Sequence, residues 1–337
     1  MEENNLIDFM MTPGAYPEDP GHIDLVQTHI SWVFIGQTYV YKVKKPVDFG
    51  FLNFSDLEKR GFYVNEELRL NQRFSPDIYI KVIPISSRDG KFYLDDNSNI
   101  VEYALKMKRI SEDHMLYRLL EKGQIQEKDM DRIAVHLARV YKEIPSDEKA
   151  RDVGTFEAIK GNVVENFDQT RKYISGPISR QAFERIEAWS IGFMDKNAGV
   201  FKERLENGFI KDCHGDLHLQ HICMEKDEIY IFDCIEFNER FRFADVAADI
   251  AFLAMDLDYN GHKGLSINFV DSYIEASKDS TMHEVLTFYK VYRAYVRAKI
   301  TSFMLDDKGL DSKTKESAIE TARKYYDLAL EYVEEEA

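Results

Sequence analysis

The order of secondary-structure signals most constrains what this chain can fold into. Aromatic and β-branched residues predict five strands, at 23–28, 30–35, 39–43, 79–85 and 100–107. A helical pattern at 56–74 separates the third strand from the fourth, and Ser55 with Glu58 matches a capping box at its start. From residue 108 onward long helical segments dominate, interrupted by a short β-rich island at 209–233. We therefore expect a bilobed α+β protein, with an N-lobe at 1–107 and a mainly helical C-lobe at 108–337.

Charge and hydropathy exclude several classes of function. The 337 residues include 44 Lys and Arg against 60 Asp and Glu, a formal net charge of −16. This balance disfavours binding to nucleic acid or to an anionic membrane surface. No apolar run approaches the ~18 residues of a membrane span, and the acidic N-terminal segment is unlike a signal peptide. Three cysteines do not make a secreted disulfide framework, so we expect a cytoplasmic protein.

The densest group of chemically capable residues is HGDLHLQH at 214–221, followed by the apolar strand IYIFD, which ends at Asp233. Asp216 precedes Asp233 by seventeen residues. Phosphoryl transfer uses two such carboxylates, one to accept or orient the proton of an acceptor hydroxyl and one to hold the metal on the nucleotide phosphates. Protein kinases place these groups in H-R-D-x-x-x-x-N and D-F-G.

These motifs resemble those of the aminoglycoside phosphotransferase-like, or small-molecule kinase-like, superfamily. The likeness extends to ISWVFIGQTYVYKVKKPVDFGFLNFSDLEKR at 30–60 and to CHGDLHLQHI at 213–222, which look like a subgroup of uncharacterised bacterial aminoglycoside phosphotransferase family enzymes. Longer members carry an additional P-loop domain, and because G-x-x-x-x-G-K-[ST] does not occur in this sequence, that domain is expected to be absent here. The resemblance implies a protein-kinase-like fold that binds ATP and Mg²⁺ between the lobes.

The resemblance also implies roles for individual residues. Asp216 corresponds to the catalytic base, Asp233 to the metal ligand, and Lys42 to the lysine that binds the α and β phosphates. An exposed strand lysine is the alternative for Lys42, and Lys44 points to the same face. Glu67 is the expected helical partner of Lys42, because it falls closer than Glu66 to the apolar stripe of this helix; a solvated glutamate is the alternative.

The nucleotide is expected to contact two further places in the N-lobe. No G-x-G-x-x-G is present, so Thr28 and Ser31 are the candidates to cap phosphates with their hydroxyls and nearby backbone N–H groups. The same two residues also suit a simple turn. By resemblance alone, adenine is expected near Met107 to Arg109, where the last N-lobe strand ends.

His221 departs from the family pattern, because it stands where relatives usually have Asn as the second metal ligand. Mg²⁺ prefers oxygen ligands, whereas imidazole suits transition metals. Three readings follow: Asp233 holds Mg²⁺ with phosphate oxygens and waters, His221 favours Mn²⁺, or the site binds nucleotide without turnover. We expect an active phosphotransferase acting on a hydroxyl of a small-molecule acceptor, with a regulatory pseudokinase as the alternative.

The remaining candidates surround this motif. His214 and Asp249 are expected to support the catalytic loop, and the segment 236–242 offers Glu236, Asn238 and Arg240 as possible substrate contacts. A basic stripe on a predicted helix suits either a solvated face or an anionic substrate: Lys290, Arg293 and Arg297.

A zinc-dependent hydrolase is a remote alternative. It rests on three histidines and three cysteines that lie within twenty-two residues, namely Cys213, His214, His218, His221, Cys223 and Cys234. Their spacing matches no recognised zinc pattern, and a cysteine on a strand is usually a small buried hydrophobe.

Overall fold

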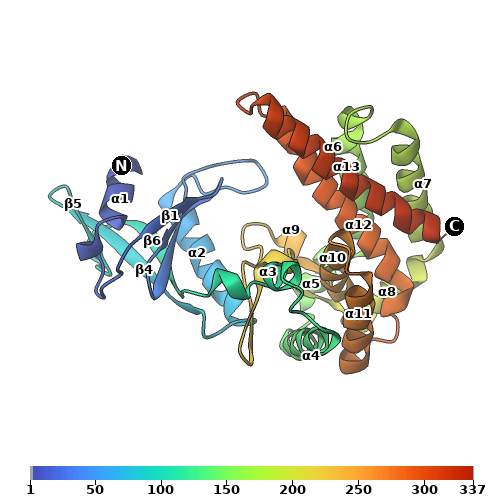
Figure 1. Cartoon of the computed structure of the whole chain (residues 1–337), viewed down its shortest axis with the longest axis horizontal. Coiled ribbons are helices and arrows are strands. Elements are labelled where there is room, and N and C mark those ends of the chain that lie inside the picture. The colour runs from blue at the N-terminus through green and yellow to red at the C-terminus, as the bar shows by residue number, and fades with distance from the viewer. Residues whose placement is uncertain (1–2, 337) are drawn as a thin grey trace. The chain divides into compact units, whose positions relative to one another are not determined.

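The chain divides into two units, each built from segments that are distant in sequence. The computed structural model describes residues 3–336, and the first unit comprises residues 3–124 and 220–239. The second unit comprises 125–219 and 240–336. The first contains a curled antiparallel sheet, and the second is mainly helical, which confirms the α+β class (Figure 1).

The sheet of the first unit has six strands in the order β1-β2-β3-β6-β4-β5, all antiparallel. These are β1 (Asp24–Gln27), β2 (Ser31–Ile35), β3 (Tyr39–Lys44), β4 (Tyr79–Arg88), β5 (Lys91–Leu94) and β6 (Ile100–Lys108). The sequence predicted five strands and missed β5. Asp89 and Gly90 both have positive φ in the two-residue turn between β4 and β5, so an Asp-Gly hairpin signal was present.

Alternation along β3 divides its side chains between the two faces of the sheet. Tyr41 and Val43 belong to an apolar cluster that also contains Trp32 and Phe34 of β2. The intervening Lys42 and Lys44 point to the opposite face, because side chains alternate along a strand.

Helix α2 (Leu57–Gln72) packs on the face that carries these lysines (Figure 1). Its N-cap is Asp56, whose side chain accepts a hydrogen bond from the backbone N–H of Lys59 at 2.8 Å, so the capping box predicted for Ser55 and Glu58 was wrong. Gly61 allows close approach to the sheet, since a Cβ there would lie 2.8 Å from the ring of Tyr103 on β6. Glu67, two turns further along, is buried.

The segment 220–239 packs with the first unit through a small hairpin. Its strands are β8 (Ile222–Glu225) and β9 (Glu228–Ile231). Ser75, just beyond α2, uses its hydroxyl both to donate to the carbonyl of Ile231 and to accept from its N–H, each at 2.7 Å. This contact holds the hairpin against the end of α2.

The second unit consists of helices around two short paired strands, β7 (Ile210–Asp212) and β10 (Phe243–Asp245). The helices in this part of the chain are α4 (Glu127–Glu143), α5 (Glu148–Val153), α6 (Phe156–Thr170), α7 (Arg180–Lys196), α8 (Ala198–Glu206), α10 (Val246–Tyr259), α11 (Lys263–Ser277), α12 (Met282–Phe303) and α13 (Ser312–Glu335). The chain also forms the short helices α1 (Glu3–Met10), α3 (Leu116–Glu121) and α9 (Glu239–Arg242).

The sequence pattern predicts long helices at 151–174 and 179–205, and the structure breaks each of them in two. Thr155 caps α6 by accepting from the N–H of Ala158, which separates α6 from α5, and Asn197 separates α7 from α8. Among the helices of residues 3–336, none is long and apolar enough to cross a membrane.

We predict opposite effects for two helical Gly→Ala changes. Gly61→Ala should destabilise the protein by about 1–3 kcal/mol, because the new methyl group meets the Tyr103 ring. Gly161→Ala in α6 should stabilise it by about 0.4–1 kcal/mol, because nothing lies within 4 Å of that Cβ and alanine restricts the unfolded chain. Urea unfolding of both variants checks the signs. A neutral Gly61→Ala would show that α2 does not need this close approach.

Candidate active site

Asp249 organises the loop that carries Asp216 in the second unit. Its fully buried carboxylate accepts from the backbone N–H groups of His214 at 2.7 Å and Gly215 at 3.1 Å. The Tyr141 hydroxyl donates to it at 2.6 Å, and the Arg293 guanidinium lies 3.2 Å away. A carboxylate with this many donors fixes the backbone of the loop on both sides of Gly215.

Asp216 lies at the tip of the loop, with 34% of its side chain exposed. His214, which is buried, accepts from the backbone N–H of Asp216 through Nδ1 at 3.3 Å. His218 Nε2 lies 3.4 Å from an Asp216 carboxylate oxygen, and its ring packs 5.6 Å from that of Phe252. A half-exposed carboxylate held in this way can accept a proton from a hydroxyl group.

The basic stripe of α12 is mostly engaged inside the second unit. Arg293 donates to the carbonyl of Gly215 at 3.0 Å as well as contacting Asp249, and Lys290 forms an ion pair with Asp258. Arg297 lies over the ring of Tyr325. The stripe is therefore not a solvated face, and Arg293 supports the loop that carries Asp216.

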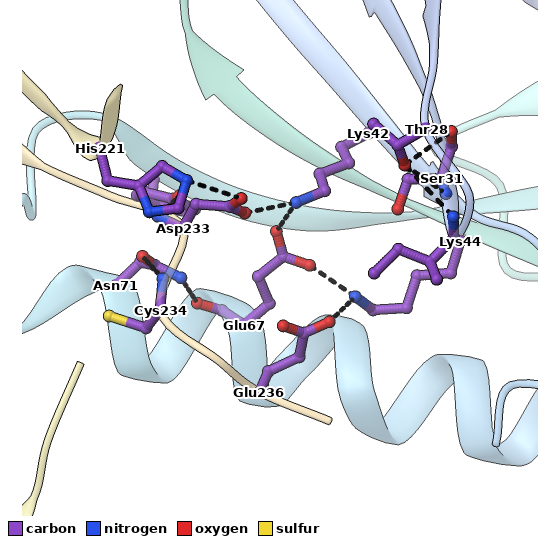
Figure 2. A network of polar contacts seen from close by, with 12 residues as sticks. Thr28, Ser31, Lys42, Lys44, Glu67, Asn71, His221, Asp233, Cys234 and Glu236 are labelled. Carbon is purple, nitrogen blue, oxygen red and sulfur yellow. Dashed lines mark hydrogen bonds and ion pairs between the residues drawn. The ribbon is translucent and has the colours of Figure 1, made fainter. Parts of the chain in front are cut away.

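Lys42 and Lys44 converge on a single glutamate in the first unit (Figure 2). Lys42 Nζ lies 2.8 Å from Glu67 Oε1 and 2.7 Å from Asp233 Oδ1. Lys44 Nζ lies 2.6 Å from Glu67 Oε2 and also forms an ion pair with Glu236. The structure thus brings together the expected Lys42, Glu67 and Asp233, and adds Lys44 and Glu236.

Both lysines are charged in this network. Burial lowers the pKa of Lys42, but the carboxylates of Asp233 and Glu67 outweigh it and hold this pKa well above the usual lysine value. The pKa of Lys44 is raised for the same reason. Burial alone would raise the pKa of Glu67, but Lys42 and Lys44 outweigh burial, and the pKa of Glu67 is lowered. The ion pairs, not desolvation, therefore decide the charge state of Glu67.

Asp233 follows β9 in a left-handed conformation with φ +66°, which is uncommon outside glycine. Its backbone N–H donates to the Tyr79 hydroxyl at 3.1 Å, and the next N–H, of Cys234, donates to Asn71 Oδ1 at 2.9 Å. These contacts from β4 and α2 hold the strained turn. They leave 42% of the Asp233 side chain exposed.

His221 also faces Asp233, with 3.6 Å between His221 Nε2 and Asp233 Oδ2 (Figure 2). A carboxylate and an imidazole at this separation fit two ligands of one divalent cation. Carboxylate, phosphate and water oxygens suit Mg²⁺, whereas participation by the imidazole favours Mn²⁺ or another transition metal.

Thr28 and Ser31 build the turn between β1 and β2. Thr28 Oγ1 accepts from the N–H groups of Ile30 and Ser31, and the Thr28 N–H donates to the Ser31 carbonyl. Ser31 is fully buried, and its hydroxyl has no hydrogen-bond partner among residues 3–336. The turn interpretation accounts for Thr28, and phosphate capping stays a prediction.

Met107 and Arg109 lie at the end of β6, as expected. Met107 is paired with Val40 of β3 and Tyr79 of β4. The Arg109 side chain donates to the carbonyl of Gly36 at 3.1 Å. Adenine binding here stays a prediction.

The three candidate substrate residues lie in different surroundings. Glu236 is only 5% exposed and forms an ion pair with the buried Lys44, and its role as a substrate contact stays a prediction. Asn238 donates to the carbonyl of Phe51 at 3.0 Å. Arg240 pairs with Glu165 at 2.7 Å.

The cysteines do not favour a zinc site. Cys213, Cys223 and Cys234 are buried and form no disulfide. Cys223 packs in an apolar cluster with Val64 and Leu105, where burial raises its thiol pKa to about 12. A thiol held in its neutral form is a poor zinc ligand.

Comparison of the sequence with curated proteins finds uncharacterised relatives. No protein-family model matches the chain. Uncharacterised proteins of Mycobacterium bovis and Mycobacterium tuberculosis are each 30% identical to it over 290 residues, which is 86% of this chain. The chain spans only 57% of the length of these curated relatives.

Solved structures of small-molecule kinases superpose over almost the whole chain. A choline kinase from Cryptosporidium parvum gives a TM-score of 0.57 at 10% identity, covering 99% of this chain and 95% of its own. A choline/ethanolamine kinase family protein from Mesorhizobium loti gives 0.53 at 10% identity, covering 98% and 99%. A GDP complex of an aminoglycoside 2′-phosphotransferase gives 0.53 at 11% identity, covering 96% and 99%.

The chain has the aminoglycoside phosphotransferase-like fold. At these identities the likeness establishes the fold and leaves reaction and acceptor open. It confirms the resemblance drawn from the HGDLHLQH and IFD motifs. Within this fold, the sequence predicted Lys42, Glu67 and Asp233 but missed Lys44 and Tyr141. The Y-V-Y-K-V-K alternation was a signal for Lys44, whereas nothing in the sequence pairs Tyr141 with Asp249.

We predict that Asp249→Asn destabilises the protein by about 3–5 kcal/mol, because it leaves the buried Arg293 charge uncompensated. The free energy of unfolding in urea measures this. Asp271→Asn, an exposed aspartate on α11, is the control and should change stability by less than about 0.5 kcal/mol. Equal effects of the two changes would refute the organising role of Asp249.

The lowered pKa of Glu67 sets a pH dependence. At pH values above the unfolded-state pKa of glutamate, about 4.3, the ion pairs of Glu67 stabilise the protein in full. That stabilisation is lost as the pH falls through the lower folded-state pKa of Glu67. We expect a double-mutant cycle of Lys44→Met and Glu67→Gln to give a coupling energy of about 1–3 kcal/mol at pH 7. The coupling should shrink below about pH 4. A coupling that is constant across this range would contradict the assignment.

Proposed function

We propose that this protein is an ATP-dependent phosphotransferase that transfers the γ-phosphate to a hydroxyl group of a small molecule. The observation that carries the proposal is the Lys42–Glu67–Asp233 network, with Lys42 Nζ within 2.8 Å of both carboxylates, in a fold shared with small-molecule kinases. Lys42 is the proposed ligand of the α and β phosphates. Thr28, Ser31 and the backbone at Met107 to Arg109 are proposed to complete the nucleotide contacts.

Asp216 is the proposed general base. It takes the proton of the acceptor hydroxyl as that oxygen forms a bond to the γ-phosphorus and the bond from this phosphorus to the ADP oxygen breaks. The support for this role is the rigid loop, because Asp249 and Arg293 fix the backbone beside Asp216. His218, 3.4 Å from the carboxylate, orients it.

Asp233 is the proposed metal ligand, with His221 as a possible second ligand. A bound divalent cation supplies charge neutralisation on the phosphates. The residues present fit Mg²⁺ through Asp233 and fit Mn²⁺ if His221 takes part. Lys42 then exchanges its contact with Asp233 for the phosphates while it keeps its contact with Glu67.

The acceptor class is proposed only as a small hydroxyl compound. Choline and ethanolamine kinases and an aminoglycoside phosphotransferase share the fold, and one of them was solved with GDP, so both ATP and GTP belong in the first tests. Substrate choice depends on side chains that differ within a fold, so aminoglycoside resistance does not follow from the family name.

We predict that ATP with Mg²⁺ stabilises the wild-type protein against heat, by about 2.7 kcal/mol at a hundredfold excess over Kd, and that Asp233→Asn loses this effect. Asp216→Asn is the matched control and should keep nucleotide binding. In a screen of hydroxyl compounds that includes choline, ethanolamine and kanamycin, Asp216→Asn should lower turnover by about 10²- to 10⁴-fold. No stabilisation of the wild-type protein by any nucleotide would reject the proposal.

A nucleotide-binding regulatory protein is the second candidate, favoured by the imidazole of His221 facing Asp233 at 3.6 Å. His221→Asn separates the two. A large gain in Mg²⁺-dependent turnover would indicate that the natural site is impaired and favour the regulatory role. A loss of turnover, greater with Mn²⁺ than with Mg²⁺, would indicate that His221 is a working ligand.

A further inference from the structure

We propose that Lys44 and Glu236 form a second lysine–carboxylate pair that positions Asp233 and Glu67 for nucleotide binding. This inference rests on the proposed phosphotransferase function. It assigns positioning roles to two residues that do not themselves contact the phosphates, one at the end of β3 and one three residues beyond Asp233.

The geometry separates the roles of the two β3 lysines. Lys42 is 15% exposed and reaches Asp233, whereas Lys44 is 2% exposed and lies between Glu67 and Glu236 (Figure 2). The Lys44 ammonium also lies 4.8 Å from the ring centroid of Phe54. Lys44 is therefore enclosed by two carboxylates and an aromatic ring, and its ammonium group is already paired with both carboxylates.

The Lys44–Glu236 pair ties the segment that follows Asp233 to the sheet. Asp233 adopts a left-handed conformation, which costs about 1–3 kcal/mol when the surroundings do not enforce it. Asn71 holds the N–H of Cys234 immediately after it, and Glu236 is the next charged anchor. Ser75 holds Ile231 before the turn, so contacts on both sides of Asp233 fix the direction in which its carboxylate points.

The loop after β3 adds to this hold. Asn238 donates to the carbonyl of Phe51, and the ring of Phe237 lies 6.0 Å from that of Phe51. Residues 236–238 thus contact β3 through the ion pair with Lys44, and the loop at 48–54 through a hydrogen bond and an aromatic contact.

Charge balance explains why a second lysine is needed. The network holds three carboxylates, those of Glu67, Asp233 and Glu236, against two ammonium groups. Lys44 neutralises Glu236 and one oxygen of Glu67. Lys42 therefore has to satisfy only the other Glu67 oxygen and Asp233. If Lys44 were absent, Lys42 would be the single cation among three carboxylates and less able to exchange Asp233 for a phosphate.

The experiment measures the Kd of ATP by calorimetry, with Mg²⁺ and with EDTA, for the wild type, Lys44→Met, Glu236→Gln and the double variant. We expect each single change to weaken binding of ATP with Mg²⁺ at least tenfold and to lower the Mg²⁺-to-EDTA affinity ratio towards one. The double variant should be no weaker than the worse single variant, because the two residues act as one pair. Lys44→Arg should restore part of the ratio.

Lys106→Met is the matched control. Lys106 is another buried lysine of the same sheet, paired with Glu18 at 2.9 Å and on the face away from α2. The Lys106→Met variant should be less stable than the wild type, but its affinity for ATP and its Mg²⁺-to-EDTA affinity ratio should be unchanged. Folded Lys44 and Glu236 variants that keep the wild-type ratio would overturn the inference while leaving the proposed function intact. A wild-type protein that binds no ATP would instead reject the proposed function, and this inference with it.

Discussion

The ion pairs of Glu67 with Lys42 and Lys44 are the interaction on which the first unit depends. A buried glutamate is costly unless it is paired, and here each of its oxygens lies within 2.8 Å of a lysine. The arrangement requires β3 to present both lysines on one face and α2 to approach that face closely, which Gly61 permits. The charge network thus couples helix, sheet and the segment after Asp233.

In the second unit, the buried carboxylate of Asp249 holds a loop in place, as Glu67 holds the lysines in the first unit. Asp249 gathers two backbone N–H groups, a tyrosine hydroxyl and a guanidinium, so that the loop beside it has one conformation. In both units the group proposed for chemistry, Asp233 or Asp216, is partly exposed and is held by a neighbour that is fully buried. Buried residues supply position, and exposed ones supply reactivity.

Sequence reasoning succeeded where a local pattern carries the information. The strand and helix signals, the alternation along β3 and the spacing of Asp216 and Asp233 each follow from neighbouring residues. Sequence reasoning missed contacts between residues that are distant in the chain. Nothing near Glu236 predicts its ion pair with Lys44, which lies 192 residues away in the sequence. Strand β5 is a different failure, since its Asp-Gly turn was readable and was missed.

The sequence by itself determined the α+β class and the face of α2 that carries Glu67, because periodicity fixes these locally. The roles predicted for Lys42, Asp216 and Asp233 came from motifs that resemble those of a known family. Only the tertiary structure decided that Glu67 pairs with two lysines, that Glu236 is buried and pairs with Lys44, and that 220–239 belongs with the sheet. The physical reason is that ion pairing in a buried environment depends on which charges the fold brings within about 3 Å, and residues far apart in the chain supply them.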